Sequence, residues 1–284
     1  IAIASGLSAD WQSYFEDVDS VTKSLGPDNK SLLFGGSGSS GQGYRNFQAA
    51  FTELSMFPVD DIEVQLAARY DTFSDFGTTL NPKLSVSWQA SKSVLFRTSF
   101  GTGFRAPNLE DLYSGSSYGF PTFVDRKACA DGVPGACRGH QYEFRTQGNP
   151  NLSEERSFFY AAGVVLQPKK TWNITVDAWG ATIKDQVGLS LSDATLVEQK
   201  INAQGGDGRQ HLIDNYGITI NRLNNGQIQD VTGTVINLGE NKLAGVDVGI
   251  NTEKDVVIAG KGMKFLANME HTQFFKSTYV TFSE

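Results

Sequence analysis

The chain has 284 residues, 39% of them hydrophobic and 19% charged, and carries a formal net charge of −7 at pH 7. This acidic balance lacks the strongly basic footprint of a nucleic-acid-binding protein. Its apolar runs are far shorter than the roughly 20 residues of a membrane-spanning helix, and its glycine and aromatic content does not fit a coiled coil or a disordered acidic tail.

Apolar and polar residues alternate along most of the chain, which is the pattern of β-strands with one apolar face. The opening stretch sets Ile1, Ile3 and Leu7 against small or polar neighbours, and Ile62 and Val64 begin a similar row. In chain order we predict nine strands, over residues 1–16, 43–57, 62–71, 81–89, 93–102, 152–167, 171–183, 234–252 and 263–275.

The predicted strands are long, with nine residues or more in each. A strand in a soluble sheet typically has about five or six residues, whereas a tilted strand that crosses a bilayer needs about 9–11. Lipid offers no partner to backbone polar groups, so such strands must close into a barrel with an apolar outside. The fold class predicted is therefore all-β, an antiparallel up-and-down transmembrane β-barrel.

The connections between the predicted strands alternate in length, which supports the same fold. Residues 58–61, 90–92 and 168–170 are tight turns, whereas residues 103–151 and 184–233 are very long. The connections at 17–42, 72–80 and 253–262 are long, intermediate and moderate, in that order. Outer-membrane barrels have short periplasmic turns and long extracellular loops.

The long loops contain three local features. Residues 35–41, rich in Gly and Ser, predict a flexible loop tip, and residues 193–204 predict a short helix. Cys129 and Cys137 flank a Pro-Gly turn and favour a small disulfide loop in an oxidising compartment, with two free thiols as the alternative. A zinc site would need further ligands nearby, and only His140 qualifies.

Two short motifs give weak support to enzyme chemistry. Residues 101–106 match the loose dinucleotide pattern G-x-G-x-x-A, but Pro107 and a Gly-rich loop follow instead of a helix. Residues 115–119 match G-x-S-x-G but lie in the middle of a loop. Because H-E-x-x-H, C-x-x-C and G-K-[ST] do not occur, we expect no enzyme, no cofactor and no metal site.

Charged residues carry two further expectations. The loop carboxylates either hold a surface cation or are ordinary solvated charges, and the second interpretation is favoured; they are Asp131, Asp207, Asp214 and Asp230. Arg97 and Asp177 lie on the polar faces of predicted strands. In a membrane barrel those faces look into the lumen, whereas in a soluble sheet they would be surface.

Residues 100–113, FGTGFRAPNLEDLY, resemble the GFRAP…DLY segment of TonB-dependent outer-membrane receptors. Four more segments resemble motifs of that family and occur in the family's order. They are residues 45–58, residues 67–83 with ARYD and NPK, residues 148–155 with GNPNL, and residues 237–247 with AGVD. The resemblance covers nearly the whole chain.

The resemblance implies that residues 1–284 are part of one barrel domain, about nine strands of a 22-stranded barrel filled by an N-terminal plug. We expect an internal piece of a longer protein whose plug, TonB box and C-terminal strands lie outside this sequence. It implies active uptake of a scarce solute across the bacterial outer membrane, driven by TonB, ExbB and ExbD. Siderophores, vitamins and oligosaccharides are the solute classes, and a surface lipoprotein is a further candidate partner beside membrane lipid.

The longest loop supplies the candidate capture residues, because aromatic rings stack on sugars or aryl ligands. They are Tyr113, Tyr118, Phe120, Phe123, Arg126 and Tyr142. Two alternatives remain open. One is a passive porin or adhesin barrel without TonB coupling, and the other is a soluble β-rich binding module.

Overall fold

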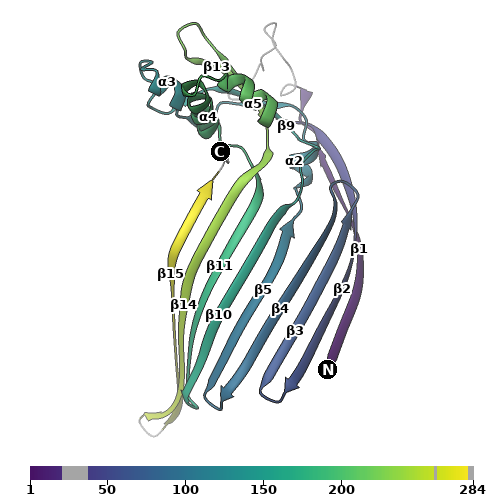
Figure 1. Cartoon of the computed structure of the whole chain (residues 1–284), viewed down its shortest axis with the longest axis vertical. Coiled ribbons are helices and arrows are strands. Elements are labelled where there is room, and N and C mark those ends of the chain that lie inside the picture. Colours follow the sequence, from purple (N-terminus) through teal and green to yellow (C-terminus); the bar gives the residue numbers. More distant parts are fainter. Residues whose placement is uncertain (21–37, 259–260, 281–284) are drawn as a thin grey trace.

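The computed structural model describes residues 1–20, 38–258 and 261–280, and it contains nine long strands in a single antiparallel sheet (Figure 1). These strands are β1 (Ala2–Glu16), β2 (Gly41–Val59), β3 (Ile62–Phe73), β4 (Gly77–Ser91), β5 (Val94–Arg105), β10 (Glu155–Lys169), β11 (Trp172–Gly188), β14 (Ile236–Ile258) and β15 (Lys261–Val280). The predicted all-β fold with nine long antiparallel strands is confirmed. The predicted loop tip at residues 35–41 lies partly outside the described residues.

The strands follow each other around the sheet in the order β1-β2-β3-β4-β5-β10-β11-β14-β15. Figure 1 shows tight turns at the lower end of the sheet and the two longest connections at the upper end. This up-and-down arrangement with alternating connection lengths is the predicted one. Because β1 and β15 are the two edges of the described sheet, the barrel is not closed and would need further strands to pair them.

The two faces of the sheet differ in polarity. Strand register places Leu66 opposite Leu84 and Ile62 opposite Trp88, and these side chains extend an apolar row across β3 and β4. Large apolar side chains on this face are exposed, Trp88 among them. In water such a face is unfavourable by about 25 cal/mol for each Å² of apolar surface, whereas lipid removes that penalty. The exposed row therefore argues against a soluble binding module.

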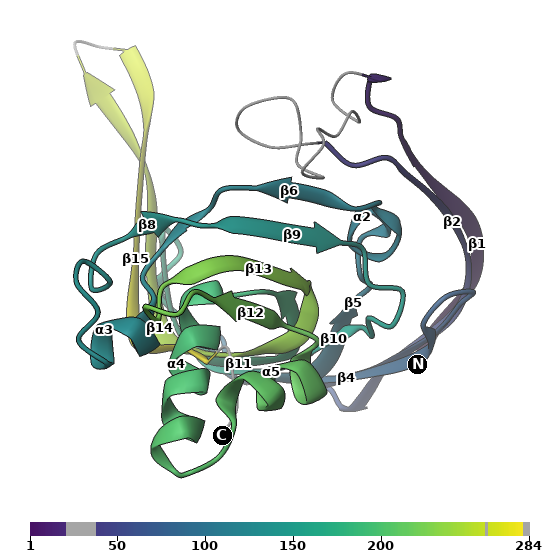
Figure 2. The ribbon, with the colours of Figure 1, turned by 90° about the horizontal axis from the view of Figure 1, so that it is seen from above.

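The polar face lines the concave side of the sheet. Tyr113, in helix α2 (Leu109–Tyr113), packs on Gly43 of β2, which lies in the same row as Arg45. Figure 2 shows α2 inside the arc of the sheet. Arg97 and Asp177 lie on this same concave face, as expected for a barrel lumen.

The C-terminal hairpin is longer than predicted. β14 continues to Ile258 and β15 begins at Lys261, so the moderate connection expected over residues 253–262 is wrong. The charged run Glu253-Lys254-Asp255 hides the alternation in the sequence, but the backbone continues the ladder because Lys254 pairs with Phe265. The hairpin extends past the neighbouring turn, where Glu253 N donates to Thr171 O at 2.9 Å.

The two longest connections fold into a separate unit, called the cap, which comprises residues 106–154 and 189–235. The first connection contributes α2, β6 (Ser117–Gly119), β7 (Thr122–Phe123), α3 (Arg126–Ala130), β8 (His140–Gln141) and β9 (Glu143–Gln147). The second contributes α4 (Leu191–Ala203), α5 (Gly208–Tyr216), β12 (Thr219–Arg222) and β13 (Ile228–Thr234). Figure 2 shows the cap lying across the mouth of the sheet.

The cap has a sheet and a core of its own. Its four strands run in the order β12-β13-β9-β6, and β13 of the second connection pairs in parallel with β9 of the first. One cluster of buried apolar residues forms this core and consists of Ala194, Leu212, Ile218, Ile220, Ile228 and Val231. The predicted helix over residues 193–204 is confirmed as α4, whereas the cap sheet, α3 and α5 were not predicted.

Side-chain caps fix the two longer helices of the cap. Ser190 accepts a hydrogen bond from Asp193 N at the start of α4, and Asp207 accepts from two backbone N–H groups at the start of α5. α5 ends at Tyr216 and is capped by Gly217, whose left-handed φ of 63° suits glycine. Within the described residues no helix is long and apolar enough to cross a membrane.

Candidate functional site

Arg45 joins three segments at the upper rim of the sheet. Its Nε donates to Asp75 Oδ2 at 2.6 Å, and its Nη2 donates to the carbonyl oxygen of Pro107 at 2.8 Å. The guanidinium carbon lies 5.6 and 5.4 Å from the ring centroids of Phe73 and Phe76. Arg45 is buried, so it acts as a fixed support between β2, the β3–β4 turn and the exit of β5.

Two asparagines from the resemblance motifs close the same rim. Asn149 N donates to Asp111 O at 2.8 Å, and Asn149 Nδ2 donates to Val235 O at 3.0 Å. Asn237 Oδ1 accepts from Ser153 N, and its Nδ2 donates back to Ser153 O. These bonds link α2 to the returning ends of both long connections. The motifs therefore build the frame from which the cap projects.

A cavity of about 720 Å³ opens on the inner face beneath this frame, and we call it the rim cavity. Its lining includes aromatic rings from β2 and β3 and charged groups from β3, β5 and α2. These aromatic and charged residues include Phe47, Phe73, Arg69, Asp71, Arg105 and Glu110. The cavity is bounded by β1, β2, β3 and β5 and by the start of the first long connection.

Two arginines of the rim cavity are held from behind by buried carboxylates. Arg69 donates to both oxygens of Asp71, and its side chain is 43% exposed whereas that of Asp71 is 2% exposed. Arg105 donates through Nε and Nη2 to Glu155, with exposed fractions of 61% and 6%. The carboxylates hold both guanidiniums in place, and Arg69, Asp71 and Arg105 all belong to the lining of the rim cavity.

Inside the cap, Arg222 forms a buried ionic cluster with Asp125 and Glu198, called the latch. Its Nη1 donates to Asp125 Oδ2 and its Nη2 to Glu198 Oε2, both at 2.6 Å. Burial by itself lowers the pKa of Arg222, but hydrogen bonds to the two carboxylates outweigh it and raise that pKa above its ordinary value. The guanidinium is therefore charged and ties β12 and α4 to the first connection.

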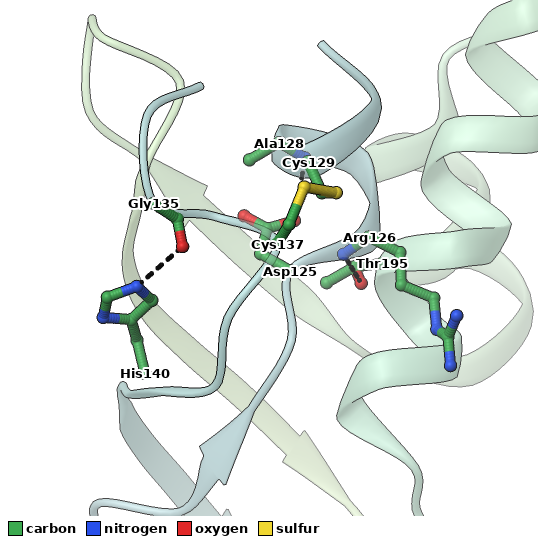
Figure 3. Close-up of a disulfide and its surroundings, with 8 residues drawn as sticks. All are labelled: Asp125, Arg126, Ala128, Cys129, Gly135, Cys137, His140 and Thr195. Atoms are coloured by element: carbon green, nitrogen blue, oxygen red, sulfur yellow. Dashed lines mark hydrogen bonds between the residues drawn. A yellow bond between two sulfur atoms is a disulfide. The ribbon is translucent and has the colours of Figure 1, made fainter. Parts of the chain in front are cut away.

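A disulfide between Cys129 and Cys137 closes the loop after α3 (Figure 3). Next to it, Arg126 N donates to Thr195 Oγ1 of α4 at 2.9 Å. His140, the one nearby residue that could have completed a zinc site, instead has its Nε2 2.9 Å from the carbonyl oxygen of Gly135. Within the described residues no group of three or more His, Cys, Asp or Glu side chains could hold a metal ion.

The loop carboxylates have separate partners. Asp131 pairs with Lys127, and Asp230 accepts from Asn221. Asp214 accepts from Gln210, while Asp207 caps α5. This supports the favoured interpretation of ordinary loop charges.

Three of the six candidate capture residues lie in packed positions. Phe123 and Tyr142 have ring centroids 4.7 Å apart and pack against the cap core. A Cβ at Gly43 would lie 2.1 Å from Tyr113 Cδ2, so Tyr113 occupies the space that this glycine leaves on β2. Burial raises the pKa of both tyrosines above the ordinary value.

The other three candidates lie nearer the surface of the cap. Tyr118 on β6 is opposite Arg145 of β9, and its ring centroid lies 6.1 Å from that of Phe120, which is exposed. The Arg126 side chain is exposed and donates from Nε to Ser192 Oγ at 3.2 Å. The structure therefore does not gather all six residues at one site. Sequence reasoning missed Arg69 and Arg105, although both stand in quoted motifs.

A second polar patch lies deeper on the concave face. Arg97 of β5 donates to both oxygens of Asp177 on β11, at 2.8 and 2.6 Å. The two residues bridge β10 at Gly163, where a Cβ would lie only 2.0 Å from Asp177 Oδ1. Nearby, the buried atoms Trp179 Nε1 and Asp247 Oδ1 have no hydrogen-bond partner in the described part of the chain.

An antiparallel sheet with an apolar outer face, a polar concave face and a folded cap over one end defines the wall of an outer-membrane receptor barrel. A family model described as "TonB dependent receptor-like, beta-barrel" matches residues 3–280. The chain belongs to this outer-membrane family of transport receptors. Among the curated proteins none matches the chain.

Solved structures of siderophore receptors share the fold. The siderophore receptor PirA from Acinetobacter baumannii is 14% identical, with a TM-score of 0.61 over 97% of this chain and 34% of that chain. PirA from Pseudomonas aeruginosa is 13% identical, with a TM-score of 0.55 over 98% of this chain and 40% of that one. A mutant of the P. aeruginosa ferric enterobactin receptor PfeA in complex with enterobactin is 14% identical, with a TM-score of 0.56 over 96% and 33%. The chain thus spans between a third and two fifths of these receptors.

Proposed function

We propose that this chain is part of the barrel wall of a transporter that takes up a scarce solute through the outer membrane, with energy supplied by TonB, ExbB and ExbD. The observation that carries the proposal is the family match over residues 3–280, together with a nine-stranded wall whose polar face is concave. A plug domain would fill the lumen and contact TonB. No catalytic residue is needed for such transport.

Capture of the solute would begin at the cap and continue in the rim cavity. Tyr118, Phe120 and Arg126 provide aromatic and cationic surface on the cap. Tyr113, Phe123 and Tyr142 would act indirectly, because they hold the cap in shape. A siderophore, a vitamin and an oligosaccharide are the solute classes that we propose, and a lipoprotein docked on the cap is a proposed further partner.

Uptake by cells tests the proposal. The full-length receptor is expressed in a strain without its own receptors, and accumulation of labelled siderophores, cobalamin and oligosaccharides is measured with and without a functional TonB. We expect accumulation of one solute class that stops when TonB is lost or the proton gradient is collapsed. Accumulation that is independent of TonB would instead identify a passive porin, and no accumulation of any class would reject transport.

A further inference from the structure

We propose that the upper end of β11, β14 and β15 binds a phosphorylated lipid of the outer leaflet on the outward face of the wall. Lysines of these strands hold its phosphate groups, and the apolar surface below them holds its acyl chains. This inference goes beyond the proposed function, because it concerns the face that meets lipid and does not depend on transport. The residues of this site, called the outer basic patch, are Lys184, Lys242, Lys276 and Glu240.

Charged residues occupy only a small part of the outward face. Strand register extends the row of Trp88 and Phe96 across the sheet, and in the described strands β1 to β5 this outward row contains no charged residue. On the next four strands the upper part of the row carries the cations Arg156, Lys184, Lys242 and Lys276. The other charges of the row, such as Lys254, lie near the lower turns. The upper cations therefore gather on one side of the wall.

The four cations lie at nearly one height. Arg156 and Lys184 are register partners, Lys242 on β14 is two residues below the level of Lys184, and Lys276 on β15 is two residues below that of Lys242. Figure 1 shows that the strands lean, so that a register partner one strand nearer to β15 lies higher. At a tilt of about 40° each such step rises by about 3 Å, whereas two residues down a strand descend by about 5 Å. The steps compensate, and the cations stay within about 4 Å of one level.

The outer basic patch has an excess of positive charge. Lys242 Nζ lies 2.7 Å from Glu240 Oε2, and the two side chains are partly exposed. The charges of Lys184 and Lys276 also act on Glu240, and both lysines are exposed. In the described part of the chain neither of these two lysines has an ion-pair partner. Three ammonium groups therefore share one carboxylate.

Arg156 flanks the patch without adding to this excess. Its Nη2 lies 2.7 Å from Glu154 Oε1, and the charge of Asp185 acts on it as well. With these two carboxylates included, the upper corner still carries one positive charge more than negative ones. Lys184 and Lys276 stand two strands apart, which is about 10 Å, so their flexible ammonium groups can converge on one phosphorylated headgroup.

Apolar surface for acyl chains begins directly below these cations. Phe158 and Tyr160 follow Arg156 in the outward row of β10, and both rings are exposed. Further down, an apolar groove of about 530 Å³ crosses β4, β5, β10 and β11, with Ala162 and Ala178 in its lining. From Arg156 to Ala162 the strand covers about 20 Å, which at this tilt descends by about half of a hydrocarbon core of roughly 30 Å. An acyl chain of the outer leaflet spans this depth.

Binding of defined lipids to the purified full-length receptor tests this inference. The probes are bis-phosphorylated lipid A, the same lipid without its phosphates, and inorganic phosphate, and native mass spectrometry measures the lipid that stays bound. We expect the phosphorylated lipid to bind more tightly than the dephosphorylated one. The double variant Lys184→Gln/Lys276→Gln should weaken binding of the phosphorylated lipid roughly fivefold per lysine, or on the order of 25-fold in all. Added salt should weaken it further.

Lys254 provides a matched control. It is exposed on the same outward row of β14, but at the lower end of the strand. Lys254→Gln should therefore leave lipid binding unchanged. The variant Lys184→Arg/Lys276→Arg keeps both positive charges and should retain most of the binding. Gels of unheated samples report whether each variant contains a folded barrel.

Three results would overturn the inference. One is equal binding of phosphorylated and dephosphorylated lipid A by the unmodified receptor, a comparison that holds even where a variant does not fold. Another is a loss in Lys254→Gln as large as that in the double glutamine variant. The third is displacement of the lipid by an equal concentration of inorganic phosphate, because an isolated anion would then suffice. TonB-dependent uptake is measured separately, so these results leave the proposed function untouched.

Discussion

Replacement of Arg222 by methionine should loosen the cap while leaving the barrel wall intact. The change removes the guanidinium that donates to Asp125 and Glu198 and leaves two carboxylates buried without a counter-charge. Loss of one partner of a buried ion pair typically costs about 3–5 kcal/mol. Since about 1.4 kcal/mol corresponds to a factor of ten, the cap should open roughly 10²- to 4 × 10³-fold more often.

Amide hydrogen exchange of the full-length receptor measures this opening directly. Protection in α4 and in β13 should fall by that factor in Arg222→Met, whereas protection in β10 and β11 should not change. Lys127→Ala is the control, because its pair with Asp131 lies at the cap surface and should contribute less than about 1 kcal/mol. If Arg222→Met and Lys127→Ala lose protection equally, the latch does not hold the cap together.

A triple variant separates lost attraction from stranded charge. Asp125→Asn/Glu198→Gln/Arg222→Met removes all three charges, and asparagine can still cap α3 as Asp125 does. Because neutral side chains avoid most of the desolvation penalty, we expect the triple variant to regain most of the protection that Arg222→Met loses. A triple variant as open as the single one would mean that the latch acts by attraction alone.

Two further predictions concern the wall and the disulfide. Gly163→Ala should destabilise the wall by about 1–3 kcal/mol, because the added Cβ overlaps Asp177 Oδ1. In the control Gly262→Ala the added Cβ meets nothing within 4 Å, so this variant should be neutral. The loss of folded barrel on gels of unheated samples measures both variants, and equal effects would contradict the steric argument. The double variant Cys129→Ser/Cys137→Ser should lower the stability of the cap by about 2–3 kcal/mol, the value expected for a disulfide loop of this size. We expect faster hydrogen exchange confined to α3 and the loop after it. Loss of protection throughout the wall would refute a local role of the disulfide.

The wall could be predicted from the sequence because its physics is local. Each strand needs one apolar face, so alternation such as Ile62, Val64 and Leu66 shows in the sequence itself. The predicted strand boundaries were wrong where charged residues interrupt the apolar alternation, as at Glu253-Lys254-Asp255. Backbone pairing with the next strand continues there regardless of side-chain polarity. Once a barrel was assumed, the same alternation predicted which side chains lie on the inner face and which on the outer face.

The cap could not be predicted because its pairings are non-local. β9 pairs in parallel with β13 from the other connection, and such short strands show no periodicity that identifies a partner. Aromatic residues of a long loop also have two uses, and sequence alone does not separate them. Phe123 and Tyr142 support the core of the cap, whereas Phe120 is exposed. A connection long enough to fold uses its own rings for packing.

The division of the cap between two connections has a consequence for the order of assembly. β9 pairs with β13, with Glu143 in register with Asp230, only when β5, β10, β11 and β14 lie side by side. This order follows because those four strands carry the ends of both connections. Closing such a distant contact in an unfolded chain is entropically costly, whereas a finished wall makes it short-range. We therefore expect the cap to fold last, after the wall has inserted into the membrane. A compact cap at the cell surface then indicates that the strands beneath it have reached their correct register.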